Sequence, residues 1–89
     1  MGHHMIDPGK KPEYLRMTKD EISSAFNRLG LSPNQFCRLT GAAYGRVTKD
    51  WLEGRDVPPW VPVLLSSWLA SSQAFEAAKI EAETRLISE

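Results

Sequence analysis

A pair of short helical segments around a glycine turn, spanning residues 31–54, constrains the fold more than any other feature of this chain. Ser32 is a favourable N-cap, Pro33 suits the first helical position, and the side chain of Gln35 can reach back to form a capping box. Gly41 then ends the first segment, because glycine adopts the left-handed C-terminal conformation at little cost. The pattern predicts two helices of about two to three turns, joined by a turn of about three residues.

Apolar spacing within this pair predicts which sides face the core. Leu31 and Phe36 are placed to form a hydrophobic staple around the start of the first helix. In the second segment Val47 and Trp51 form an inward line, and a glycine then provides a stop. We therefore expect the second helix to run over about residues 43–53, with its remaining positions exposed.

Further helices flank the pair. Thr18 and Glu21 form a second capping box, and the helix that they open is predicted to end at Gly30. Its inward stripe comprises Ile22, Ala25, Phe26 and Leu29. A later helix is expected over about residues 59–71, where apolar residues occupy more than one face and therefore require cover on two sides.

The C-terminal segment, residues 72–89, is expected to form an amphipathic helix. Its apolar positions are Phe75, Ala78, Ala82 and Leu86 on one stripe, with Ile80 and Ile87 beside it. This helix can fold back over Trp60 and Trp68 or pair with a partner chain, and we favour dimerisation. Together the segments predict an all-α, compact bundle of four to five helices that contains a helix-turn-helix. Residues 1–14 are interpreted as an expression-tag remnant and a flexible arm, and residues 15–71 as the main domain.

Composition limits the domain count and the class of partner. The 89 residues, 42% of them hydrophobic, suffice for one small domain with a modest core. Eleven lysines and arginines balance eleven acids, so the chain lacks the basic excess typical of nucleic-acid binders. Residues 1–60 carry nine bases and seven acids, whereas the remainder carries two bases and four acids. The N-terminal part is thus mildly basic and the C-terminal part acidic.

Few residues suit catalysis, metal binding or membrane insertion. His3 and His4 belong to the tag remnant, and Cys37 lies beside Phe36, which favours a packing role over a reactive thiol. The sequence has no cysteine cluster, phosphate-binding glycine loop or nucleophile elbow, so we expect no enzyme, cofactor, metal or small-molecule substrate. The apolar runs are too short for a membrane span and no secretory signal is present, which predicts a cytoplasmic protein.

Residues 17–69 resemble the lambda-repressor-like (Cro-type) helix-turn-helix family of phage and bacterial transcription regulators. The resemblance rests on Cys37 after Phe36, the corner Gly41, the inward Val47, the Trp51-Leu52-Glu53-Gly54 ending and the proline-started helix at Pro59-Trp60. It implies a transcriptional regulator, with repression favoured over activation, that binds a palindromic operator in double-stranded DNA as a homodimer. It also implies a nucleoid-associated protein whose helix at about 43–53 lies in the major groove.

Helical geometry selects the side chains that face away from the inward line of Val47 and Trp51. The predicted DNA-binding residues on the second helix are Tyr44, Gly45, Arg46, Thr48 and Lys49, which can contact phosphates or base edges. Ser32 and Asn34, at the start of the preceding helix, are predicted phosphate contacts. Arg55, just beyond the second helix, is a further predicted phosphate contact.

Other interpretations of these residues remain open. Arg46 and Lys49 can belong to a solvated face that also carries acids, and Tyr44 can be a core aromatic. Ser32 can be occupied entirely by capping. A different function class is open as well, namely a protein-protein interaction module of the antitoxin or adaptor type. Neutral charge and an exposed Leu52 favour that alternative.

Overall fold

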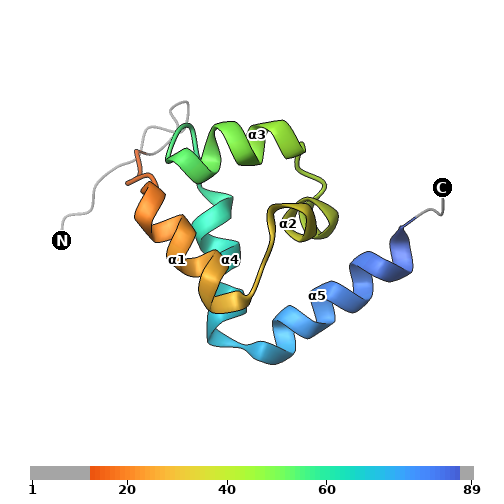
Figure 1. The fold of residues 1–89 in the computed structure, drawn as a ribbon. Coiled ribbons are helices and arrows are strands. Elements are labelled where there is room, and N and C mark those ends of the chain that lie inside the picture. The colour runs from red at the N-terminus through yellow and green to blue at the C-terminus, as the bar shows by residue number, and fades with distance from the viewer. Residues whose placement is uncertain (1–12, 87–89) are drawn as a thin grey trace, which may run out of the picture.

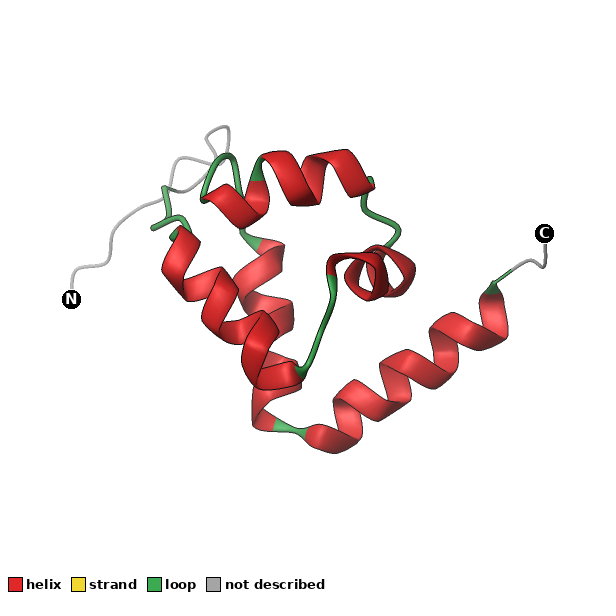
Figure 2. Ribbon diagram, viewed as in Figure 1, coloured by secondary structure: helices red, strands yellow, loops and turns green. Residues whose placement is uncertain are grey.

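Five α-helices and one short 3-10 helix form residues 13–86, the part of the chain that this computed structural model describes. In chain order they are α1 (Lys19–Leu29), α2 (Pro33–Thr40), α3 (Tyr44–Lys49), the 3-10 helix η1 (Trp51–Glu53), α4 (Trp60–Ala70) and α5 (Ser72–Arg85) (Figure 1). The described residues contain helices and loops but no strand (Figure 2). The predicted all-α class is therefore confirmed. The tag remnant, the start of the predicted arm and Ile87 lie outside the described residues.

Local sequence fixes the starts of α1 and α2. The Glu21 N–H donates to Thr18 Oγ1 (3.2 Å), and the Thr18 N–H donates to Glu21 Oε1 (2.9 Å). At α2, the Gln35 N–H donates to Ser32 Oγ (3.1 Å) and the Ser32 N–H donates to Gln35 Oε1 (3.3 Å). Both predicted capping boxes are confirmed, and each satisfies backbone N–H groups that lack a partner inside the helix. Gly41 ends α2 in the left-handed conformation (φ 78°), as predicted.

The segment predicted as one helix over residues 43–53 is interrupted at Asp50. α3 ends one residue earlier, and η1 follows and closes at Gly54 in the left-handed conformation (φ 80°). The prediction of a continuous helix is therefore wrong in its second half. A 3-10 turn is a common way to end a helix, and here it leaves Val47 (0% exposed) and Trp51 (6% exposed) in the core. The predicted inward line is confirmed.

Phe36 of α2 lies at the centre of the core and is fully buried. Four other aromatic rings have centroids 5.1 to 6.4 Å from its own, those of Phe26, Trp51, Trp60 and Trp68. Aromatic pairs at such distances add to the stabilisation that comes from buried area alone. One side chain of α2 thereby joins α1, η1 and α4, which fixes the helix pair relative to the rest of the bundle.

α5 turns back toward its own chain after α4. Ser71 joins the two helices and caps α5, because its Oγ accepts the Ala74 N–H (3.1 Å). The ring of Phe75 then packs against that of Trp68, with 5.1 Å between centroids. Figure 1 shows α5 running from the end of α4 past α2. Of the two predicted alternatives for this segment, packing over a tryptophan is therefore observed, whereas pairing with a partner chain stays a prediction.

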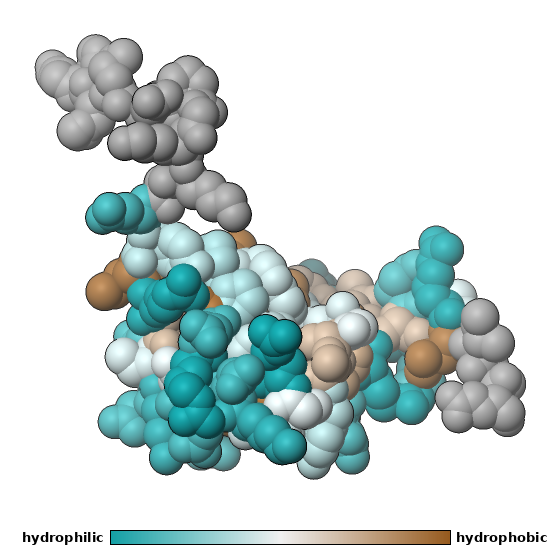
Figure 3. Space-filling view, turned by 90° about the horizontal axis from the view of Figure 1, so that it is seen from above, coloured by the Kyte–Doolittle hydropathy of each residue, from teal (hydrophilic) through white to brown (hydrophobic). Residues whose placement is uncertain are grey.

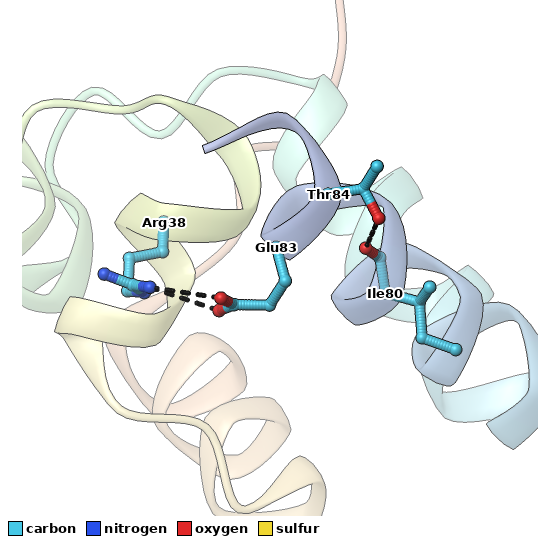
Figure 4. Close-up of polar contacts among 4 residues, drawn as sticks. All are labelled: Arg38, Ile80, Glu83 and Thr84. Atoms are coloured by element: carbon cyan, nitrogen blue, oxygen red, sulfur yellow. Dashed lines mark hydrogen bonds and ion pairs between the residues drawn. The ribbon is translucent and has the colours of Figure 1, made fainter. Parts of the chain in front are cut away.

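The contact between α5 and α2 is polar at its outer end. Arg38 Nη2 lies 3.1 Å from Glu83 Oε2, and Figure 4 shows the two side chains bridging the helices. Ile80 points away from this pair (Figure 4) and is 66% exposed. Along the predicted stripe, Phe75 is buried but Leu86 is 42% exposed. The apolar attachment of α5 to the bundle therefore lies mainly in its first half.

Candidate nucleic-acid interface

The outer side of α3 carries most of the predicted DNA-binding residues. Tyr44, Gly45, Arg46 and Lys49 are exposed, and Thr48 is half-buried. Figure 3 views the molecule from the side on which α3 lies in Figure 1, and hydrophilic residues cover most of this face of the bundle. Tyr44 is 53% exposed, so the alternative in which it is a core aromatic is wrong. Five predicted contacts thus share one short helix.

Asp50, at the break between α3 and η1, links two of the predicted arginine contacts. Its Oδ2 lies 3.8 Å from Arg46 Nε, and its Oδ1 lies 3.7 Å from Arg55 Nε. Arg55 also donates through Nη2 to the carbonyl oxygen of Lys49, the last residue of α3. The alternative in which acids neutralise a solvated face therefore has a structural basis. Exposed ion pairs contribute only about 0–1 kcal/mol, however, so a competing anion can replace the carboxylate at little cost.

The two predicted contacts on α2 lie outside this arginine cluster. Ser32 is engaged in capping, since its Oγ accepts the Gln35 N–H. Asn34 is exposed in the first turn of α2. Within residues 13–86, no hydrogen bond or ion pair joins either side chain to the arginines around Asp50. The Ser32 hydroxyl can still donate its proton to an anion at the positive end of α2.

Two threonines use their hydroxyl groups inside the helix pair. Thr48 Oγ1 donates to the Tyr44 carbonyl oxygen (2.9 Å), which leaves its methyl group as the part suited to an external contact. Thr40 Oγ1 donates to the Phe36 carbonyl oxygen (2.8 Å) and accepts the Ala42 N–H (3.2 Å). Thr40 thereby stabilises the turn before α3, which begins without a side-chain cap. Sequence reasoning missed this role, although threonines commonly bond to the backbone four residues back.

A second surface, formed by α4 and α5, differs sharply from that of α3. Residues 57–75 contain no lysine, arginine, aspartate or glutamate. Two large apolar side chains of this segment are nevertheless exposed to solvent, Val63 at 70% and Trp60 at 42%. Trp60 also lines a groove of about 680 Å³ between α2, α4 and α5. Its other apolar lining residues are Leu39, Leu64, Trp68, Ala78, Ala82 and Leu86, and the charged side chains of Arg38, Glu81 and Arg85 also line it. Exposed apolar side chains beside an open groove are typical of a contact surface for another molecule.

Leu52, predicted to be exposed, is half-buried and packs against the core. The prediction is wrong because η1 packs against α1, a contact between elements that local spacing does not reveal. The protein-interaction alternative therefore loses the support of Leu52. The uncharged surface of α4 now provides the structural argument for that alternative.

Cys37 is half-buried and packs against the core. Burial raises the pKa of its thiol above the ordinary value, which lowers the fraction of reactive thiolate at neutral pH. This environment suits the predicted packing role. In residues 13–86, no three histidine, cysteine, aspartate or glutamate side chains gather as a metal site. The helices of the same region are too short or too polar to cross a bilayer.

Comparisons with known proteins leave the candidate interface to be judged on its own geometry. No protein-family model, no curated protein and no solved structure matched the chain.

Proposed function

We propose that the protein is a sequence-specific, double-stranded DNA-binding transcriptional regulator, with repression favoured over activation, that inserts α3 into the major groove. The observation that carries this proposal is the two-sided character of the segment. Val47 and Trp51 are buried, while Arg46 and Lys49 are exposed on the other side. A helix anchored on one side and basic on the other meets the requirements of major-groove recognition. The resemblance to lambda-repressor-like regulators supports the same function.

Each predicted contact has a chemical role in this proposal. Arg46 and Lys49 donate hydrogen bonds to guanine or to phosphates. Gly45 lets the backbone of α3 approach the DNA closely, since open space lies where a Cβ atom would stand. The remaining contacts are Tyr44 to a phosphate or base edge, the Thr48 methyl group to a thymine, and Arg55, Ser32 and Asn34 to phosphates.

A second copy of the chain completes the proposed regulator, because a palindromic operator matches the twofold symmetry of a homodimer. The first half of α5 already packs on its own chain through Phe75 and Trp68. Within α4 and α5 the large apolar side chains that remain exposed are those of Val63, Trp60 and Ile80. We therefore place the dimer contact on the outer side of these two helices.

Selection of bound fragments from a random DNA pool tests the proposal directly. Specific binding by a dimer predicts enriched fragments with two inverted half-sites spaced by about one helical turn or a multiple of it. Affinity for the enriched fragment should fall steeply as salt rises, since phosphate contacts release counterions. Recovery of fragments without any shared sequence would contradict the proposal.

Substitutions on α3 identify the reading surface. Arg46→Ala and Lys49→Ala should each weaken binding to the enriched fragment by about 1–3 kcal/mol where the side chain reads a base. Arg85→Ala is the matched control, because it removes one positive charge from an exposed side chain on α5. Circular dichroism should show that all three variants are folded. Unchanged affinity in both α3 variants would refute the assignment of this helix.

A protein-protein interaction module of the antitoxin or adaptor type is the second candidate function. The groove beside Trp60 favours it, because none of the predicted DNA contacts lines that groove. Binding through such an apolar surface depends weakly on salt, whereas DNA binding depends on it steeply. A partner captured equally well at low and high salt, together with no enriched DNA sequence, would favour this second function.

A further inference from the structure

The carboxylate of Asp50 faces two different arginines at once. Oδ2 lies 3.8 Å from Arg46 Nε, and Oδ1 lies 3.7 Å from Arg55 Nε. Asp50 occupies the position where α3 ends and η1 begins, and its side chain is 32% exposed. One acid thus sits between the two arginines that flank the end of the proposed reading helix.

The two ion pairs leave different guanidinium nitrogens available for DNA on Arg46 and on Arg55. Asp50 approaches Arg46 along the Nε side, so the two terminal nitrogens of that guanidinium can still donate together to the O6 and N7 atoms of a guanine. Arg55 is engaged twice, because Nη2 donates to the Lys49 carbonyl oxygen while Nε faces Asp50. Its remaining nitrogen can make a single contact, which suits a phosphate rather than a base.

The negative charge of Asp50 also acts on any DNA that approaches α3. It repels phosphates whatever the base sequence. Random DNA gains nothing in return, because binding to it depends almost entirely on phosphate contacts. A site with a correctly placed guanine gains from the bias that attraction to Asp50 gives the Arg46 guanidinium.

We infer that Asp50 is a positioning residue for DNA recognition, which orients Arg46 toward a guanine and disfavours binding to random sequence. The inference rests on the proposed function and adds a specificity-determining residue to it. The residue itself contacts no base; it acts through the guanidinium of Arg46.

Asp50→Asn tests this role, because asparagine has nearly the same shape and no charge. Affinity is measured at one salt concentration for the enriched fragment and for a random-sequence fragment of equal length. We expect the variant to bind random DNA roughly three- to fivefold more tightly, because a repulsive charge is gone. The enriched fragment gains as much from the lost repulsion but loses a similar amount with the orientation of Arg46, so its affinity should change by less than about twofold. The ratio of the two affinities therefore falls. Glu53→Gln is the control: it removes an acid that pairs with Lys19 (3.1 Å), so both affinities should change by the same factor.

Arg46→Lys supplies a second measurement that leaves Asp50 intact. Lysine keeps the charge but lacks the planar fork that a carboxylate can orient. This variant should lose at least as much discrimination as Asp50→Asn, and adding Asp50→Asn to it should cause no further loss. Thermal unfolding of each variant separates these effects from loss of the fold.

The outcomes distinguish this inference from the proposed function. If the wild-type protein does not discriminate between the two fragments, the proposed function fails and the role of Asp50 fails with it. If the wild-type protein discriminates and Asp50→Asn keeps the same affinity ratio, only the role of Asp50 is overturned. Full discrimination by Arg46→Lys overturns it as well, even if Asp50→Asn fails to fold.

Discussion

Two adjacent segments of this chain build surfaces of opposite character. Residues 44–56, which form α3, η1 and the loop that follows, contain six charged side chains among thirteen residues. Residues 57–75, which form α4 and the start of α5, contain none among nineteen. Both segments bury one side in the same core, but their outer sides differ. We therefore propose a separate contact for each, DNA on the charged outer side and protein on the apolar one.

Phe36 packs beneath both surfaces, against Trp51 of η1 and against Trp60 and Trp68 of α4. Its removal should therefore have the largest effect on the free energy of unfolding. Phe36→Ala should lower the free energy of unfolding by about 3–5 kcal/mol, because a fully buried ring between α1, η1 and α4 would leave a cavity. Urea denaturation measures the loss. Tyr44→Ala, on an exposed side chain, should change stability by less than about 0.5 kcal/mol. Similar losses of stability in the two variants would contradict the role of Phe36 as the shared core contact of both surfaces.

Gly54 ends η1 within the charged segment. Gly54→Ala should destabilise the protein by about 1–3 kcal/mol, because φ is +80° and the new Cβ would lie 2.9 Å from the backbone nitrogen of Lys19. Gly45 is the matched control in helical backbone with open space around it, where alanine should stabilise by about 0.5–1 kcal/mol. Thermal unfolding measures both. Stability shifts of the same sign in the two variants would contradict this account of Gly54.

Val63 tests whether the uncharged surface joins two copies of the chain. Val63→Glu should weaken self-association at least about tenfold, or about 1.4 kcal/mol, because a charge would be buried in the contact. Sedimentation across a concentration series measures association. Lys49→Ala, on the charged surface, should leave association unchanged while weakening DNA binding. A wild-type protein that stays monomeric at every concentration would contradict the proposed contact between two copies of the chain.

Removal of the ion pair between Arg38 and Glu83 should have the smallest effect on the free energy of unfolding. Both side chains are more than half exposed, so Glu83→Ala should cost less than about 1 kcal/mol, and less still at high salt. Denaturant unfolding at two salt concentrations measures it. The apolar contact of Phe75 with Trp68 should instead hold α5 in place. A loss above about 2 kcal/mol would assign that task to the ion pair.

Much of the fold could be predicted because its signals are local. The capping boxes of Thr18 with Glu21 and of Ser32 with Gln35 join residues three apart, so their spacing in sequence is their spacing in space. The burial of Val47 and Trp51 could be predicted from helical geometry. The half-burial of Leu52 could not be predicted in the same way, because it arises from packing of η1 on α1.

The candidate site was predictable only as a set of exposed side chains. Helical geometry placed Arg46 and Lys49 on the outer side of the second helix, where the structure also has them. It did not place Asp50 between Arg46 and Arg55, because that arrangement depends on where α3 ends and how Arg55 turns back. The groove beside Trp60 was equally beyond local reasoning, since three separate helices line it.

The sequence by itself therefore determined where α1 and α2 begin and end and which line of side chains after the glycine turn faces the core. Capping and helical periodicity act between residues three or four apart, so the order of residues is sufficient. Tertiary structure decided the break at Asp50, the pairing of two arginines with one acid, and the docking of Phe75 on Trp68. These features depend on which distant side chains meet in the core, and close packing selects those partners only when all the helices are in place.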